Sequence, residues 1–238
     1  MKYKNLVFLG TSHIAKQSLN EVKKCIEEEK PDVIALELDK KRMQALMTKV
    51  PERINLRNIK HIGLKGFLFS AFGAWAERKL GKLVGIKPGS EMKQAIKIAK
   101  NEKITIALID QDIEITLRRL SNSITWKEKR NFFVDIAESL FARKKEIEFD
   151  LTTVPDKKII KKLMEKLKLR YPNVYNVLID ERNIVIARNI KGLMNSSPNK
   201  KILVILGAGH IDDVLELIKH GEETGIRFSF SVGQNQYL

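Results

Sequence analysis

The stretch from Asn5 to Arg42 constrains the fold most strongly, because two apolar runs flank a segment with helical periodicity. The first run, Leu6 to Leu9, is followed by a glycine and His13, and the second, Val33 to Leu38, carries the single charge of Glu37. This pattern predicts strand–helix–strand, with a further helix after the second strand. His13 and Glu37 then lie near the carboxyl ends of buried strands, where ligands bind in open α/β sheets. A carboxylate at such a position is costly to bury unless a partner compensates it.

Three further segments extend this pattern. Ile104 to Ile109 predicts a third buried strand that ends at Asp110, Ile202 to Leu206 predicts a fourth, and the alternation from Ile226 to Val232 predicts an edge strand. The charged segment at about 120–195 reads as a helical insertion. The fold class that follows is α/β, with a central, mostly parallel sheet, helices on both faces and that insertion.

Composition limits the class of protein. A chain of 238 residues with 43% apolar content can bury a full core, so one elaborated domain over residues 1–238 is expected. The net charge of +15 comes from lysines spread over most of the predicted helices, which favours a solvated basic surface over a specific nucleic-acid partner. The lone cysteine, Cys25, and the lack of a signal-peptide pattern favour a cytoplasmic location. No run reaches the roughly 18 apolar residues of a membrane span.

The segment from His61 to Val84 is the most aromatic part of the chain. A buried helical hairpin or lid is the favoured interpretation. The alternative is that residues 62–76 contact a membrane surface, an apolar substrate or a partner subunit.

The same device occurs twice in this sequence: an apolar strand, then G-x-x-H, then a helix. The two copies end at His13 and His210. If their strands are neighbours, both imidazoles reach one cleft, together with Glu37 or Asp110. Two histidines and a carboxylate suit a divalent transition metal, whereas either histidine alone is more often a capping residue. The second copy also half-matches a dinucleotide-binding loop, but the third glycine is missing.

These motifs together resemble the TraB/PrgY/GumN family, which includes Tiki-like members and has a ChaN/EreA-like fold. The matching segments, in chain order, are GTSH, PDVIALELDKKR, KPGSEMKQAI, ALIDQDIEITLRR, YPNVYNVLIDERN and VILGAGH. The resemblance implies that His13 and His210 are metal ligands and that Glu37 and Arg42 form an E-L-x-x-x-R element. Its remaining motifs contain Glu91, Asp110, Asp112, Arg119, Glu181 and Arg182. The family pattern D-R-D departs here, because Gln111 replaces the arginine.

The resemblance also implies an activity. Tiki-like members look like metal-dependent proteases, PrgY-like members restrain peptide pheromones and ChaN-like relatives bind haem. The leading prediction is therefore a metal-dependent hydrolase, in particular a peptidase. The alternative is a non-catalytic regulator that binds a peptide or haem-like ligand, with association to a membrane surface.

The predicted site follows from this reading. The metal would be Mn, Co, Zn or Fe, with His13, His210, Glu37 and Asp110 as candidate ligands. Glu37 is also a candidate general base. Candidate catalytic residues are Glu37, Arg42, Arg119, Glu181 and Arg182, since arginines can hold a substrate carboxylate or stabilise an oxyanion. The expected partners are a peptide or small-molecule substrate and a second copy of the chain in a homodimer.

Overall fold

The structure is a computed structural model that describes residues 1–11, 16–48, 89–141 and 157–223. Its strands are β1 (Lys2–Tyr3), β2 (Leu6–Thr11), β3 (Val33–Leu36), β4 (Thr105–Leu108) and β5 (Ile202–Gly207). Its helices are α1 (Lys16–Glu29), α2 (Lys40–Met47), α4 (Ser90–Asn101), α5 (Ile113–Ser123), α6 (Trp126–Phe141), α7 (Lys157–Arg170), α8 (Pro172–Tyr175), the π-helical turn η1 (Asn176–Asp180), α9 (Glu181–Ser196) and α10 (Ile211–Glu223).

The strands form one sheet in the order β1-β2-β5-β3-β4. β2, β5, β3 and β4 are parallel, whereas β1, which the sequence pattern did not predict, pairs with β2 in the antiparallel direction. The predicted α/β fold with a mostly parallel sheet is confirmed. The carboxyl ends of the four parallel strands therefore meet at one edge of the sheet.

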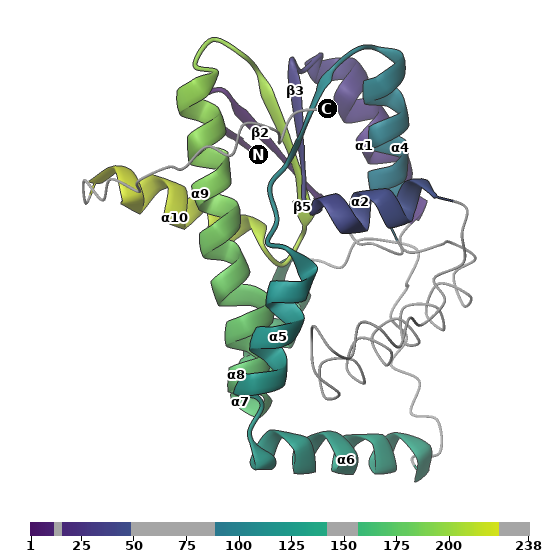
Figure 1. The fold of residues 1–238 in the computed structure, drawn as a ribbon, viewed down its shortest axis with the longest axis vertical. Helices are drawn as coiled ribbons and strands as arrows, with labels where there is room; N and C mark the ends of the chain where they lie inside the picture. The colour runs from purple at the N-terminus through teal and green to yellow at the C-terminus, as the bar shows by residue number, and fades with distance from the viewer. Residues whose placement is uncertain (12–15, 49–88, 142–156, 224–238) are drawn as a thin grey trace.

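Both faces of the sheet are covered by helices, as predicted (Figure 1). Successive residues of the central strand β5 point to opposite faces. Val204 and Leu206 pack in the cluster that includes α9 and α10, whereas Leu203 and Ile205 pack in the cluster that includes α1 and α4. Each of these side chains is fully buried, which stabilises the fold by about 1.5–3 kcal/mol apiece.

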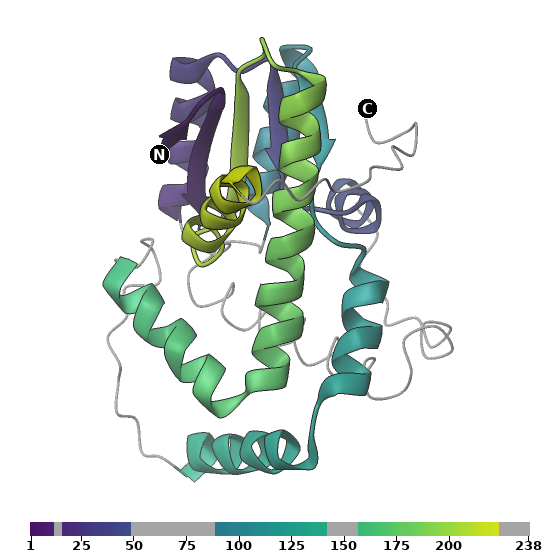
Figure 2. The same ribbon diagram turned by 90° about the vertical axis from the view of Figure 1, so that its left-hand side faces the viewer.

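Between β4 and β5, the described residues form the helices α5 to α9, in the region where the sequence predicted helices. Figures 1 and 2 show α6 at the end of the molecule remote from the sheet. Helix α9 has two roles, because its buried residues Ile186 and Ile190 pack against the sheet while its first turn extends beyond the sheet edge. It thus connects the helical region to the end of the sheet where the candidate site lies.

Three predictions fall outside the described residues: the aromatic segment at 62–76, the edge strand at 226–232 and the position of His13. Within the ranges that the structure does describe, no helix has the length and apolar character to span a bilayer.

Candidate functional site

A cluster of charged side chains lies at the carboxyl edge of the sheet. Glu37 directly follows β3, Asp110 follows β4 by two residues, and His210 follows β5 by three. The side chains of Glu37 and Asp110 are almost fully buried. The parallel strands therefore bring these three predicted residues to one end of the sheet, as their placement in the sequence suggested.

Arg182 joins the two buried carboxylates. Its Nε and Nη2 donate to Asp110 at 3.1 and 2.6 Å, and Nη2 also lies 2.5 Å from Oε1 of Glu37. Nη1 donates to the carbonyl oxygen of Leu178 at 3.1 Å. The planar guanidinium can satisfy several acceptors at once, which an ammonium group on a lysine could not do in the same geometry.

The E-L-x-x-x-R element has a direct structural explanation. Asp39, two residues after Glu37, is the N-cap of α2 and accepts from the backbone N–H groups of Lys41 and Arg42 at 2.8 and 3.1 Å. The other oxygen of Asp39 accepts from Nε of Arg42 at 2.6 Å. Nη2 of Arg42 then donates to Asp110. The spacing thus places Glu37 at the end of the strand and Arg42 in the first turn of the following helix, where its guanidinium reaches Asp110.

The arginines keep the buried carboxyl group of Asp110 ionised. Burial alone would raise the pKa of Asp110, but hydrogen bonds and charge interactions with Arg182 and Arg42 outweigh it and lower this pKa to about 2. In the same way burial opposes the charge of Arg182, but Asp110 and Glu37 raise its pKa above the ordinary value. The three carboxylates Glu37, Asp39 and Asp110 meet two guanidiniums, so these five side chains carry a net charge of 2 − 3 = −1.

His210 faces this cluster from the turn after β5. Its backbone N–H donates to the carbonyl of Gly207 at 2.9 Å, which closes the G-x-x-H turn. Nδ1 lies 2.6 Å from Oδ1 of Asn183, and Nε2 lies 3.4 Å from Oε1 of Glu37. The second carboxylate oxygen of Glu37 accepts from the backbone N–H of Gly207 at 2.6 Å. Asn183 and the backbone of Gly207 thus hold the imidazole and the carboxylate next to each other.

The first G-x-x-H copy begins beside the second. In the parallel pairing of β2 with β5, Thr11 lies opposite Gly207. A Cβ added at Gly10 would lie 2.7 Å from Cδ1 of Ile211 on α10, so the end of that side chain would have to shift to admit a larger residue. His13 itself lies outside the described residues, so its meeting with His210 stays a prediction.

Two predicted catalytic residues lie apart from the buried cluster. Arg119 on α5 and Glu181 at the start of α9 pair with each other, with Nε–Oε2 at 3.0 Å and Nη2–Oε1 at 2.5 Å. The Arg119 side chain is 57% exposed. Of the other motif residues, Asp112 is the N-cap of α5, and Glu91 is buried in the first turn of α4.

Sequence reasoning overlooked Asn183 and left the role of Gln111 open. Asn183 is 2% exposed and contacts His210; it ends the segment YPNVYNVLIDERN but was not among the predicted site residues. It shares its helix face with Ile186 and Ile190, so a polar residue on an otherwise apolar stripe was the available signal. Gln111, the departure from D-R-D, turns away from the arginines, and its Nε2 donates to Oγ1 of Thr116 at 3.0 Å.

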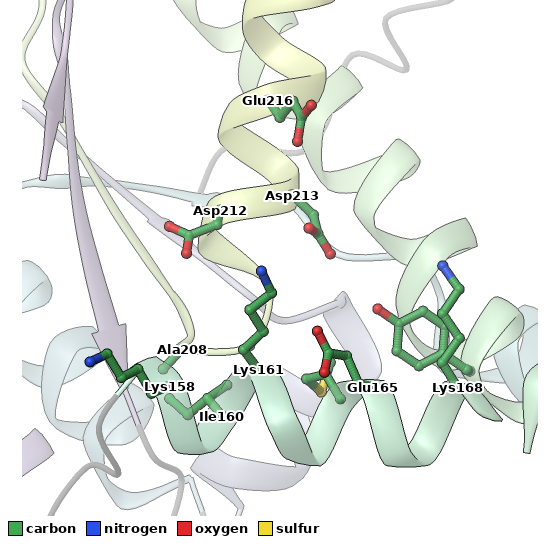
Figure 3. A pocket seen from close by; sticks show the side chains of 12 residues that line it. Lys158, Ile160, Lys161, Glu165, Lys168, Ala208, Asp212, Asp213 and Glu216 are labelled. Atoms are coloured by element: carbon green, nitrogen blue, oxygen red, sulfur yellow. The ribbon is translucent and has the colours of Figure 1, made fainter. Parts of the chain in front are cut away.

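A cavity of about 510 Å³ adjoins the His210 turn (Figure 3). Ala208 and Gly209 form part of its wall, and a Cβ added at Gly209 would lie 3.3 Å from Cε of Met164. Side chains of α7, mostly lysines, line one side and carboxylates of α10 the other; they are Lys158, Lys161, Glu165, Lys168, Asp212, Asp213 and Glu216. Figure 3 shows Lys161 extending from α7 toward Asp212 and Asp213.

Asp213 links the cavity to the charged cluster. One of its oxygens accepts from Nδ2 of Asn183 at 3.3 Å. Burial raises the pKa of Asp213, and the neighbouring charges of Asp180 and Glu216 raise it further.

Among the side chains that the structure describes, no group of three or more His, Cys, Asp or Glu residues is arranged to hold a metal ion. His210 and Glu37 supply two donors, and a third would have to come from elsewhere.

Comparison with known proteins identifies the family. The sequence model of the TraB/PrgY/gumN family matches residues 2–229. An uncharacterized protein of Methanocaldococcus jannaschii is 38% identical over 219 residues, which are 90% of this chain and 53% of that protein. TraB domain-containing proteins of Mus musculus and Homo sapiens are 23% and 22% identical over 233 residues, 87% of this chain and 60% of theirs. The chain thus spans little more than half the length of these relatives, and it belongs to the TraB/PrgY/gumN family.

Proposed function

We propose that this chain is a metal-dependent hydrolase that acts on peptides. The observation that supports this most directly is the 3.4 Å approach of Nε2 of His210 to Oε1 of Glu37. Two ligands of one tetrahedral zinc ion, each about 2.0–2.1 Å from the metal, lie roughly 3.3 Å apart. The pair therefore has the spacing of two neighbouring metal ligands.

The third ligand that we propose is His13. Gly10 pairs with Leu206 and Thr11 with Gly207, so the two G-x-x-H turns start within one residue of each other on adjacent strands. Asp110 is the weaker candidate, because both of its oxygens already accept hydrogen bonds from arginines. Two histidines and one carboxylate suit Zn, Mn, Co or Fe and leave a coordination position open.

The net charge of the cluster also favours a cation. Among the described side chains, Glu37, Asp39 and Asp110 have a formal charge of −3 against +2 on Arg42 and Arg182, and they are largely buried. A divalent ion would be attracted to such an acidic cluster, and it would polarise a peptide carbonyl and make water more acidic.

The protein side chains have separate tasks in this proposal. One oxygen of Glu37 accepts from Arg182 and the other from the N–H of Gly207, and these contacts hold it 3.4 Å from Nε2 of His210, as the proposed ligand role requires. Arg182 and Arg42 bind and orient the carboxylates, and in this proposal their positive charge would stabilise an oxyanion that forms beside the cluster. The adjoining cavity, with lysines facing carboxylates, offers partners for both charged ends of a peptide.

Elemental analysis of untagged protein tests the proposal. We expect about one Zn, Mn, Co or Fe per chain in the wild type, loss of the metal in the His13→Ala/His210→Ala double variant, and peptide cleavage that chelators abolish. His220→Ala is the matched control, because His220 is an exposed histidine that pairs with Glu216 on α10. Full peptidase activity in the double variant would contradict the proposal.

A second candidate is a non-catalytic regulator that binds a peptide or haem-like ligand. The contacts of Arg182 favour this function. Its N–H groups donate to Asp110, Glu37 and Leu178 within the protein, so they are engaged in structural hydrogen bonds and not directed at a reacting substrate. This function predicts tight ligand binding without turnover and no response to chelators. Calorimetric titration with unlabelled peptides or haem, with and without EDTA, separates the two.

A further inference from the structure

We propose that Asn183, itself held by Asp213, is a positioning residue that fixes neutral His210 as the tautomer with its proton on Nδ1. The lone pair of Nε2 then faces Oε1 of Glu37 at 3.4 Å, a longer and weaker acceptor–acceptor contact than the 2.6 Å contact that the other tautomer would create at Nδ1. The consequence for metal binding rests on the function proposed above, whereas the tautomer itself does not depend on it.

The orientation of the Asn183 amide follows from its two partners. A primary amide has a donor end and an acceptor end. Its Nδ2 lies 3.3 Å from a carboxylate oxygen of Asp213, which accepts hydrogen bonds. The carbonyl end must then face His210, where Oδ1 lies 2.6 Å from Nδ1. Since that oxygen can only accept, Nδ1 must be the nitrogen that donates.

The other tautomer would be unfavourable at this position. It would place the Nδ1 lone pair 2.6 Å from the lone pairs of Oδ1, so two acceptors would be in contact without a proton between them. Asn183 and His210 are 2% and 7% exposed, so little solvent is present to relieve that repulsion. Asn183 also sits on the stripe of α9 that packs against the sheet, which holds its position.

This arrangement has the form of an outer partner of a metal-bound histidine. Such histidines usually donate their second ring N–H to a carbonyl or carboxylate, which orients the ring toward the metal. Asp213 extends the chain of hydrogen bonds to the wall of the cavity. His210 is thereby connected through Asn183 to the surface on which a ligand would bind.

Nitrogen NMR of metal-free protein tests the tautomer directly. Long-range ¹H–¹⁵N correlations at about pH 9, well above the usual imidazole pKa of about 6.5, distinguish the two neutral tautomers and the imidazolium. We expect the wild type to carry a proton on Nδ1 of His210 alone. A proton on Nε2, alone or together with Nδ1, would overturn the proposal.

Substitutions at the amide sharpen this test. In Asn183→Leu the acceptor is lost, so we expect the proton to move to Nε2, where it can donate to Glu37. Leucine suits the apolar stripe of α9, which preserves the fold. Asn189→Leu is the matched control, since Asn189 lies on the same helix but donates to the carbonyl of Ile109 at 2.9 Å. An unchanged tautomer in Asn183→Leu would overturn the proposal.

The exchange variant Asn183→Asp/Asp213→Asn provides a rescue. It restores an acceptor facing His210 and a donor behind it, so we expect Nδ1 to be protonated again; a proton on Nε2 alone would count against the proposal.

Metal titration is a separate readout. If the proposed function holds, Asn183→Leu lowers metal affinity about 10–100-fold. An altered tautomer with no metal bound even in the wild type would leave the positioning role standing and remove the hydrolase proposal.

Discussion

Glu181 and Arg182 are consecutive residues, yet the two arginine–carboxylate groups to which they belong differ strongly in their exposure to solvent. Glu181 pairs with Arg119, whose side chain is 57% exposed, whereas Arg182 is 14% exposed and binds two buried carboxylates. Adjacent residues on an α-helix point about 100° apart, so one faces α5 and the next faces the sheet edge. Similar pairings therefore have different consequences: the outer pair is screened by water, and the inner one is required to compensate buried charge.

Removing Arg182 should have the largest effect on the stability of the fold. Arg182→Ala leaves Glu37 and Asp110 buried without their shared counter-ion, so we expect a loss of about 3–5 kcal/mol in the free energy of unfolding. Urea denaturation monitored by circular dichroism measures it. A loss below about 1 kcal/mol would mean that the cluster is no more demanding than a surface pair.

The pH dependence of stability should show the next effect. The pKa of Asp110 is about 2 in the folded protein and ordinarily 3.8, so its contribution is complete above about pH 4 and is lost as the pH falls toward 2. This lowering of the pKa corresponds to roughly 2 kcal/mol, and solvent does not screen it because the Asp110 side chain is fully buried.

Unfolding titrations from pH 5 to about pH 2 measure this contribution. We expect Asp110→Asn to flatten the dependence, even though its stability at neutral pH is also lower. Asp135→Asn is the control, because Asp135 pairs with Arg170 on the exposed surface and solvent screens that pair. Equal slopes for wild type and Asp110→Asn would contradict the prediction.

The outer pair should matter least. Arg119→Ala removes a two-fold hydrogen-bonded but exposed contact with Glu181, and we expect a loss of at most about 1 kcal/mol that shrinks further in high salt. Unfolding at low and high NaCl concentration measures it. If the proposed function holds and Arg119 takes no part in it, peptide cleavage stays at the wild-type rate. A large loss of cleavage with unchanged stability would return Arg119 to the list of catalytic residues.

The sequence was more informative about the buried group around Arg182 than about the exposed pair of Arg119 and Glu181. Glu37 and Asp110 were recognisable because a charge at the end of an apolar run demands compensation. Glu181 and Arg182 looked equivalent, since both belong to one charged turn. Only the packing of α9 against the sheet separates them. Asn183 was overlooked for the same reason, because its importance depends on His210, 27 residues further along the chain.

The sequence by itself determined the fold class, the family and the end of the sheet at which the chemistry-bearing residues gather, because strand periodicity and glycine turns are local properties. The tertiary structure decided the strand order, which places β5 between β2 and β3 and so brings His210 next to Glu37. It also decided which arginine meets which carboxylate. Those contacts join residues up to 145 positions apart, and only the packing of helices on the sheet, which no local pattern encodes, can select them.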